Sequence, residues 1–218
     1  GGSGSIITSG TVTTTGDAAH GIYALSEGGI GGGLGFNQQN STYGGYTSTG
    51  GMGGSGGAVS VSSSRDIAVG GVDAHGIYAK SVGGAGGAGN VAGVGGAADV
   101  TISGGRVQGG SGTGAGVRID AGTSAKLVNK GRLLALSGLA LDVRGSSALA
   151  ENQGTIDGNA TLAGSTTARF DNKAGGIFNS GGTVNLAAGT AVGELRNAGT
   201  VSPGGTGTIQ TTALTGNY

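Results

Sequence analysis

The chain has 218 residues, of which 56 are Gly, one is Pro and none is Cys, and 11 basic and 11 acidic side chains leave no net charge. This composition excludes collagen, which needs a strict triplet period and much proline. It also excludes a disulfide framework and thiol chemistry, and a neutral chain without a basic patch argues against nucleic acid as a partner.

A repeat organises the first third of the chain. Residues 16–32 read GDAAHGIYALSEGGIGG, and residues 71–87, 55 positions later, read GVDAHGIYAKSVGGAGG. Self-similarity of this kind marks a repeat architecture. The abundant glycine predicts almost no α-helix, and short β-branched runs such as Val100-Thr101-Ile102 predict strands with one inward and one outward face.

Two glycine-rich tracts, residues 28–57 and 83–96, follow the same position of the repeat. A shared exit point predicts insertions that leave a regular solenoid at one corner. The first tract combines Tyr with Gly, Ser and Asn, which is the composition of adaptable binding loops, and the alternative is a flexible excursion without a partner. The candidate binding residues in it are Phe36, Asn37, Gln38, Gln39, Asn40, Tyr43 and Tyr46.

Four asparagines recur in the second half, at positions 129, 152, 172 and 197, each with glycine two to four residues later. Their spacing of 23, 20 and 25 residues approximates one coil of a parallel β-helix. Asn followed by Gly suits a turn with positive φ, and stacked Asn side chains can form a hydrogen-bond ladder. We therefore expect an all-β solenoid whose coils of about 20–25 residues stack their aliphatic side chains inside.

Many of the core positions of this solenoid can be named in advance, because alternation along each predicted strand assigns the inward side chains. They are Val100, Ile102, Leu127, Leu133, Leu141, Val143, Ile156, Leu162, Phe170, Val184, Leu186 and Leu195. The same second half has fewer glycines and larger aliphatic side chains than the first, so we expect it to be the folding nucleus.

Residues 197–218, NAGTVSPGGTGTIQTTALTGNY, resemble the C-terminal end of the passenger domain of bacterial autotransporters, the proteins of type V secretion. The Ala-His-Gly-Ile-Tyr-Ala repeat with its glycine-rich continuation is similar to repeats of large passengers. The resemblance implies a right-handed parallel β-helix over residues 1–218, with an autochaperone-like end at residues 180–218. No charged segment followed by an apolar stretch marks a signal peptide, and we expect the chain to be a segment of a longer protein.

The resemblance also implies a function and a location. It implies a β-helical stalk or adhesin, exposed at the bacterial outer membrane or secreted, and contact with a membrane only through a C-terminal barrel outside this segment. The expected partners are protein or glycan molecules on host or neighbouring cells, or other copies of the chain. Alternatives are a β-helix enzyme acting on polysaccharide, a scaffold for an N-terminal effector domain, and an ice- or surface-binding solenoid suggested by the Thr-rich residues 11–15.

Candidate chemistry is sparse in this sequence. His20 and His75 are the two histidines, and each has a Ser and an Asp nearby as a catalytic triad would require. Their identical position in the repeat favours a structural role. Asp142, Asp157 and Asp171 recur at intervals that do not match a coil, so we interpret them as solvated turn residues. No phosphate-binding loop or calcium repeat occurs, and we expect no catalytic residues, no cofactor and no metal.

Overall fold

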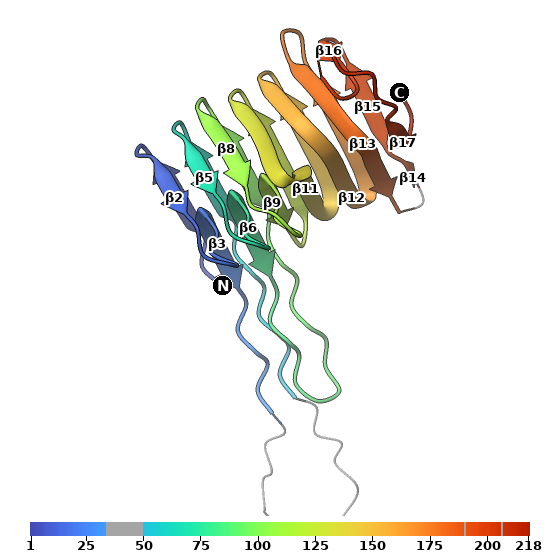
Figure 1. The fold of residues 1–218 in the computed structure, drawn as a ribbon. Helices are drawn as coiled ribbons and strands as arrows, with labels where there is room; N and C mark the ends of the chain where they lie inside the picture. Colours follow the sequence, from blue (N-terminus) through green and yellow to red (C-terminus); the bar gives the residue numbers. More distant parts are fainter. Residues whose placement is uncertain (34–49, 190, 206) are drawn as a thin grey trace, which may run out of the picture.

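The computed structural model is a parallel β-helix and describes residues 1–33, 50–189, 191–205 and 207–218 (Figure 1). These residues form one sheet of 17 strands, and every pairing between them is parallel except that of the last part of β13 with β14. The described part of the chain contains no helix that could cross a membrane. The prediction of an all-β parallel solenoid is confirmed.

The strands stack in three columns. The first column holds β1 (Gly4–Thr8), β4 (Val59–Ser63), β7 (Ala98–Ile102), β10 (Ser124–Asn129) and β15 (Glu194–Asn197). The second holds β2 (Val12–Thr14), β5 (Ile67–Val69), β8 (Arg106–Gly109) and β16 (Thr200–Val201). The third holds β3 (Ile22–Glu27), β6 (Ile77–Val82), β9 (Val117–Asp120) and β17 (Ala213–Thr215).

Long bent strands replace separate short ones in the later coils. A single strand passes through all three columns as β11 (Arg132–Asn152) and again as β12 (Thr155–Asn172). The next strand, β13 (Ile177–Ala188), spans the second and third columns, and β14 (Ala191–Val192) turns back onto it. The expectation of only short strands is therefore wrong for these coils, because the pairing continues around their corners through bulges that shift the register.

Coil length changes along the stack. Stacked positions lie 55 residues apart at Asp17 and Val72 and 40 apart at His75 and Ala115. The interval falls to 23, 20 and 25 residues in the coils joined by the asparagines. The predicted coil length is confirmed there, and the first two coils are longer because each also contains a glycine-rich tract.

The core is a column of aliphatic side chains supplied by every second residue of each strand. All twelve predicted core residues are buried, with at most 4% of any of them exposed. The C-terminal coils add two aromatic rings to this column, because Phe170 and Phe178 are both fully buried and their ring centroids lie 4.7 Å apart. Burial of such large side chains is the main source of stability in a stack whose coils contact only their neighbours.

The asparagine ladder is confirmed. The Nδ2 of Asn129 donates to Oδ1 of Asn152, Asn152 donates to Asn172, and Asn172 donates to Asn197, each at 2.8 Å. The expectation that these asparagines adopt positive φ is wrong, because the two non-glycine residues with positive φ in the described parts are Ala18 and Asp73. The asparagines instead point their amides into the stack, where three of the four are fully buried.

Candidate functional site

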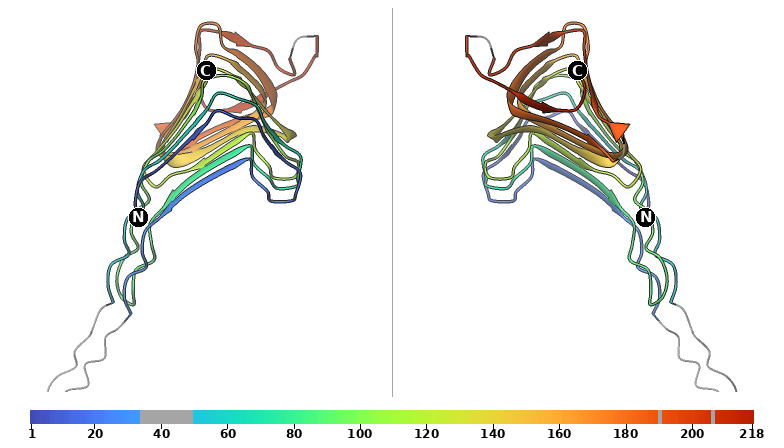
Figure 2. Two further views of the ribbon diagram at one scale, coloured as in Figure 1. Left: turned by 90° about the vertical axis from the view of Figure 1, so that its left-hand side faces the viewer. Right: turned by 90° about the vertical axis from the view of Figure 1, so that its right-hand side faces the viewer.

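The glycine-rich tracts extend from one corner of the solenoid, between the third column and the next coil's first column (Figure 2). We call their described residues, 28–33, 50–57 and 83–96, the glycine arm. The backbone runs outward along 28–33, returns along 50–57, and then runs out and back along 83–88 and 91–96. The prediction that both tracts leave at the same corner is confirmed for these residues.

The arm is held by backbone hydrogen bonds between its four segments. Every third residue donates in the 28–33 and 83–88 segments, and in the 50–57 segment the donors are Gly50, Gly51, Gly53, Gly54 and Gly56. Gly28 donates to Val82, at the end of β6, at 3.0 Å, and Gly31 donates to Ala85 of the 83–88 segment at 2.8 Å. The 50–57 segment lies inside, because it bonds to all three other segments. Further bonds run from Gly51 to Gly32, Gly54 to Gly29, Gly84 to Gly54, Gly87 to Gly51, Gly53 to Val91, Gly56 to Val94 and Gly93 to Gly84.

A three-residue repeat is the period of a polyproline-II helix, which makes no internal hydrogen bonds and offers its backbone groups to neighbours. The sequence has the same period: residues 50–58 are GGM, GGS and GGA, and residues 83–88 are GGA and GGA. A Cβ added at Gly53 or Gly84 would collide with the backbone of an adjacent segment. Glycine at the first two triplet positions therefore permits the close approach, and the third residue faces outward.

The outward positions of the arm carry exposed apolar side chains. Ile30 is 80% exposed, Met52 67%, Val91 61% and Val94 57%. The arm contains no charged residue in any of its described segments. Exposed apolar side chains without charged neighbours in the arm make it the candidate interaction surface of the described residues.

The candidate binding residues Phe36, Asn37, Gln38, Gln39, Asn40, Tyr43 and Tyr46 lie outside the described residues. In the sequence they fall between the 28–33 and 50–57 segments of the arm.

The two histidines stack in successive coils. The Nδ1 of His20 accepts the backbone N–H of His75 at 3.0 Å, and the Nδ1 of His75 accepts the backbone N–H of Ala115 at 2.8 Å. Burial, followed by the charges of His20 and Arg118, lowers the pKa of His75 to about 4. Each Nδ1 is thus occupied by a coil-to-coil bond, and this arrangement supports the structural interpretation.

The serines and aspartates near the histidines also serve the stack. Ser26 donates to the carbonyl of Gly2, and Ser81 donates to the carbonyl of Gly57. Asp17 accepts the N–H of Val72, and Asp73 accepts the N–H of Thr113 in the next coil. None of these contacts joins a serine to a histidine.

A polar cluster covers the outer face of the third column beside the histidines. Tyr78 donates a 2.7 Å hydrogen bond to Asp120, and burial together with this bond raises the pKa of Tyr78 to about 12. Arg118 bridges Asp120 at 3.0 Å and Asp142 at 3.7 Å, and Arg144 binds Asp142 with two hydrogen bonds. The guanidinium of Arg118 also lies 5.3 Å from the centroid of the Tyr78 ring, a cation–π contact.

The interpretation of Asp142, Asp157 and Asp171 as solvated turn residues is wrong. All three lie within strands, and Asp142 and Asp171 are 2% and 4% exposed. Each is paired: Asp142 with Arg144, Asp157 with Arg132, and Asp171 with Lys173. They are therefore partners in ion pairs on the strands and not solvated turn residues.

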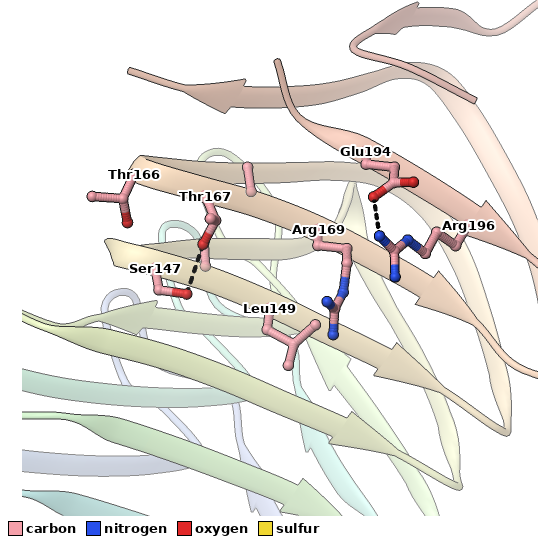
Figure 3. Close-up of a pocket in the computed structure, with 9 residues that line it drawn as sticks. Ser147, Leu149, Thr166, Thr167, Arg169, Glu194 and Arg196 are labelled. Carbon is pink, nitrogen blue, oxygen red and sulfur yellow. Dashed lines mark hydrogen bonds and ion pairs between the residues drawn. The ribbon is translucent and has the colours of Figure 1, made fainter. Parts of the chain in front are cut away.

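A shallow groove of about 250 Å³ lies on the outer face of the first column in the C-terminal coils (Figure 3). Thr167 and Ser147 are joined across it by a 2.8 Å hydrogen bond, and Arg169 stands at its centre. Glu194 is the carboxylate among its lining residues, and a bond from Arg196 lowers the pKa of Glu194. No group of three His, Cys, Asp or Glu side chains that could hold a metal ion occurs in the described parts of the chain.

Comparison of the chain with protein-family models, with curated proteins and with solved structures found no match.

Proposed function

We propose that the chain is part of an autotransporter passenger, a β-helical stalk at the bacterial surface or secreted, that attaches to molecules on other cells or to other copies of itself. The observation that carries this proposal is the glycine arm, which extends an apolar, uncharged surface from one corner of a regular coil stack. The parallel β-helix and the sequence resemblance support it. The imidazoles of His20 and His75 and the hydroxyl of Tyr78 make hydrogen bonds between neighbouring coils, as a scaffold requires.

The alternative of a polysaccharide-cleaving enzyme has less support. A glycoside hydrolase generally needs two carboxyl groups, one of which has a raised pKa so that it can donate a proton. In the groove of Figure 3, Glu194 has a lowered pKa because Arg196 stabilises its charged form. We therefore place the function of this segment in attachment.

The test is to express residues 1–218 between a signal peptide and an autotransporter barrel, with the barrel alone as the control. The proposal predicts that protease added to intact cells removes the segment, and that the displayed segment increases binding of the bacteria to host cells or to each other. A second variant with short turns in place of residues 28–57 and 83–96 should be displayed but should not increase attachment. Failure of display, or equal attachment by the barrel alone, would refute the proposal.

A further inference from the structure

The groove of Figure 3 lies where pairing in the first column is interrupted. On the side of the next coil, β12 is paired up to Gly164, opposite Ala188 of β13, and again from Arg169, opposite Glu194 of β15. Among the described strands, residues 165–168 have no partner on this side, because the next coil turns back at β14. The interruption leaves a recess of about 250 Å³ beside Arg169.

Arg169 is held firmly at one end of its guanidinium and is open at the other. Its Nε is buried and lies 3.1 Å from Oδ1 of Asp171, whose side chain is 5% exposed. Lys173 holds the other carboxylate oxygen of Asp171 at 2.9 Å. The Arg169 side chain is nevertheless 39% exposed, and its one ion pair within the described residues is this contact through Nε. Its two terminal nitrogens therefore face the groove in a fixed position (Figure 3).

The rest of the lining combines hydroxyl groups with a neutralised carboxylate. Ser147 and Thr167 share a 2.8 Å hydrogen bond, which uses one of their two hydroxyl protons and leaves the other free to donate. Arg196 pairs with Glu194 at 2.7 Å, so the lining side chains carry one net positive charge, that of Arg169. The groove thus places a guanidinium fork beside groups that can donate hydrogen bonds to hydroxyls and accept them.

This combination restricts the ligand. Two free guanidinium nitrogens match a carboxylate, which accepts two parallel hydrogen bonds. Hydroxyl groups beside the fork match a ligand that carries hydroxyls of its own. The volume lies below the ~300 Å³ at which drug-sized sites begin, so the bound part must be small, such as a single sugar ring.

We propose that the groove binds a carboxylate-bearing sugar, whose carboxylate lies on Arg169 and whose hydroxyls contact Ser147 and Thr167. The inference goes beyond the proposed function, because the groove lies in the C-terminal coils, apart from the glycine arm, and takes a defined class of ligand.

The test is titration of the purified chain with glucuronic acid, followed through amide chemical shifts, with glucose as the uncharged control. Glucuronic acid should shift the signals of residues 166–169 saturably, and glucose should not. Arg169→Gln should weaken binding about tenfold or more. The matched control Arg132→Gln removes an arginine that pairs with Asp157 on the second column, and it should bind as the wild type does. No saturable shift in the wild type, or unchanged binding by Arg169→Gln, would overturn the proposal.

Further variants separate a sugar site from a simple anion site. Arg169→Lys keeps the charge and a partner for Asp171 but loses the two-nitrogen fork, so it should bind glucuronic acid more weakly than the wild type. The double variant Ser147→Ala with Thr167→Val removes the hydroxyls, so it should weaken binding of glucuronic acid and leave binding of sulfate unchanged. Equal affinity of the wild type for sulfate and glucuronic acid, with no effect of the double variant, would show an anion site only and overturn the assignment of a sugar.

Discussion

His20 lies directly against His75 of the next coil: the backbone N–H of His75 donates to Nδ1 of His20 at 3.0 Å, and the two rings stack with their centroids 4.9 Å apart. His75 repeats the contact with the N–H of Ala115. Both bonds require an unprotonated Nδ1. The histidine positions of the repeat therefore join one coil to the next only when the imidazoles are neutral.

This contact makes stability depend on pH. Burial lowers the pKa of His75 to about 4 in the folded chain, from 6.5. Between these values the unfolded chain binds the proton more readily, so the free energy of unfolding should fall as the pH drops from 6.5 towards 4, by at most about 3 kcal/mol. Urea unfolding across this range measures it.

The control for the pH effect is His75→Asn, whose side-chain oxygen can accept the same N–H without titrating. Its stability should change less than that of the wild type between pH 6.5 and 4.5. An equally steep loss in both proteins would assign the pH dependence to other groups.

The asparagine ladder should contribute strongly at its centre. Asn152 is fully buried, and it receives a bond from Asn129 while it donates one to Asn172. Asn152→Ala leaves buried polar groups without partners and should lower the free energy of unfolding by about 2–4 kcal/mol. Asn197→Ala, at the exposed end of the ladder, should cost about 1 kcal/mol. Equal losses in urea unfolding would show that burial of the ladder does not matter.

The aromatic pair should be the most sensitive part of the apolar core. Phe178 is fully buried against Phe170, so Phe178→Ala should cost about 3–5 kcal/mol through the cavity it leaves. Leu136→Ala, at a position that is 56% exposed, should change stability by less than about 0.5 kcal/mol. Thermal and urea unfolding of both variants check this, and a small effect at Phe178 would mean that the coils repack around the cavity.

The C-terminal coils should fold without the N-terminal ones. They contain the long strands β11 and β12, the asparagine ladder and the phenylalanine pair. A fragment of residues 100–218 should therefore resist protease and unfold cooperatively in urea, whereas a fragment of residues 1–96 should not. An N-terminal fragment that is at least as resistant would refute a C-terminal folding nucleus.

The solenoid could be predicted from the sequence because its signals are local. Alternation along a strand assigns the core residues, and the spacing of the asparagines gives the coil length. The interpretation of Asp142, Asp157 and Asp171 was wrong because their intervals of 15 and 14 residues were compared with one full coil. They lie instead in the third, second and first columns, so each interval covers two successive column-to-column steps and falls short of a full coil.

The order of the glycine arm was missed although its signal is present in the sequence. The triplets of residues 50–58 and 83–88 mark a three-residue period, but glycine-rich composition is equally typical of flexible segments. Composition alone does not indicate the hydrogen bonds, which join residues from separate tracts such as Gly31 and Ala85. Composition predicted a binding loop whose residues lie outside the described part of the chain. The exposed surface that the structure describes is the glycine arm, which adjoins that loop in the sequence.

Amide hydrogen exchange of the glycine arm tests the central claim most directly. The account predicts slow exchange at the hydrogen-bonded amides of the two inner segments, such as Gly53, Gly54, Gly84 and Gly87. Uniformly fast exchange at the rate of an unfolded chain throughout 28–33, 50–57 and 83–96 in the wild-type protein would contradict an ordered arm.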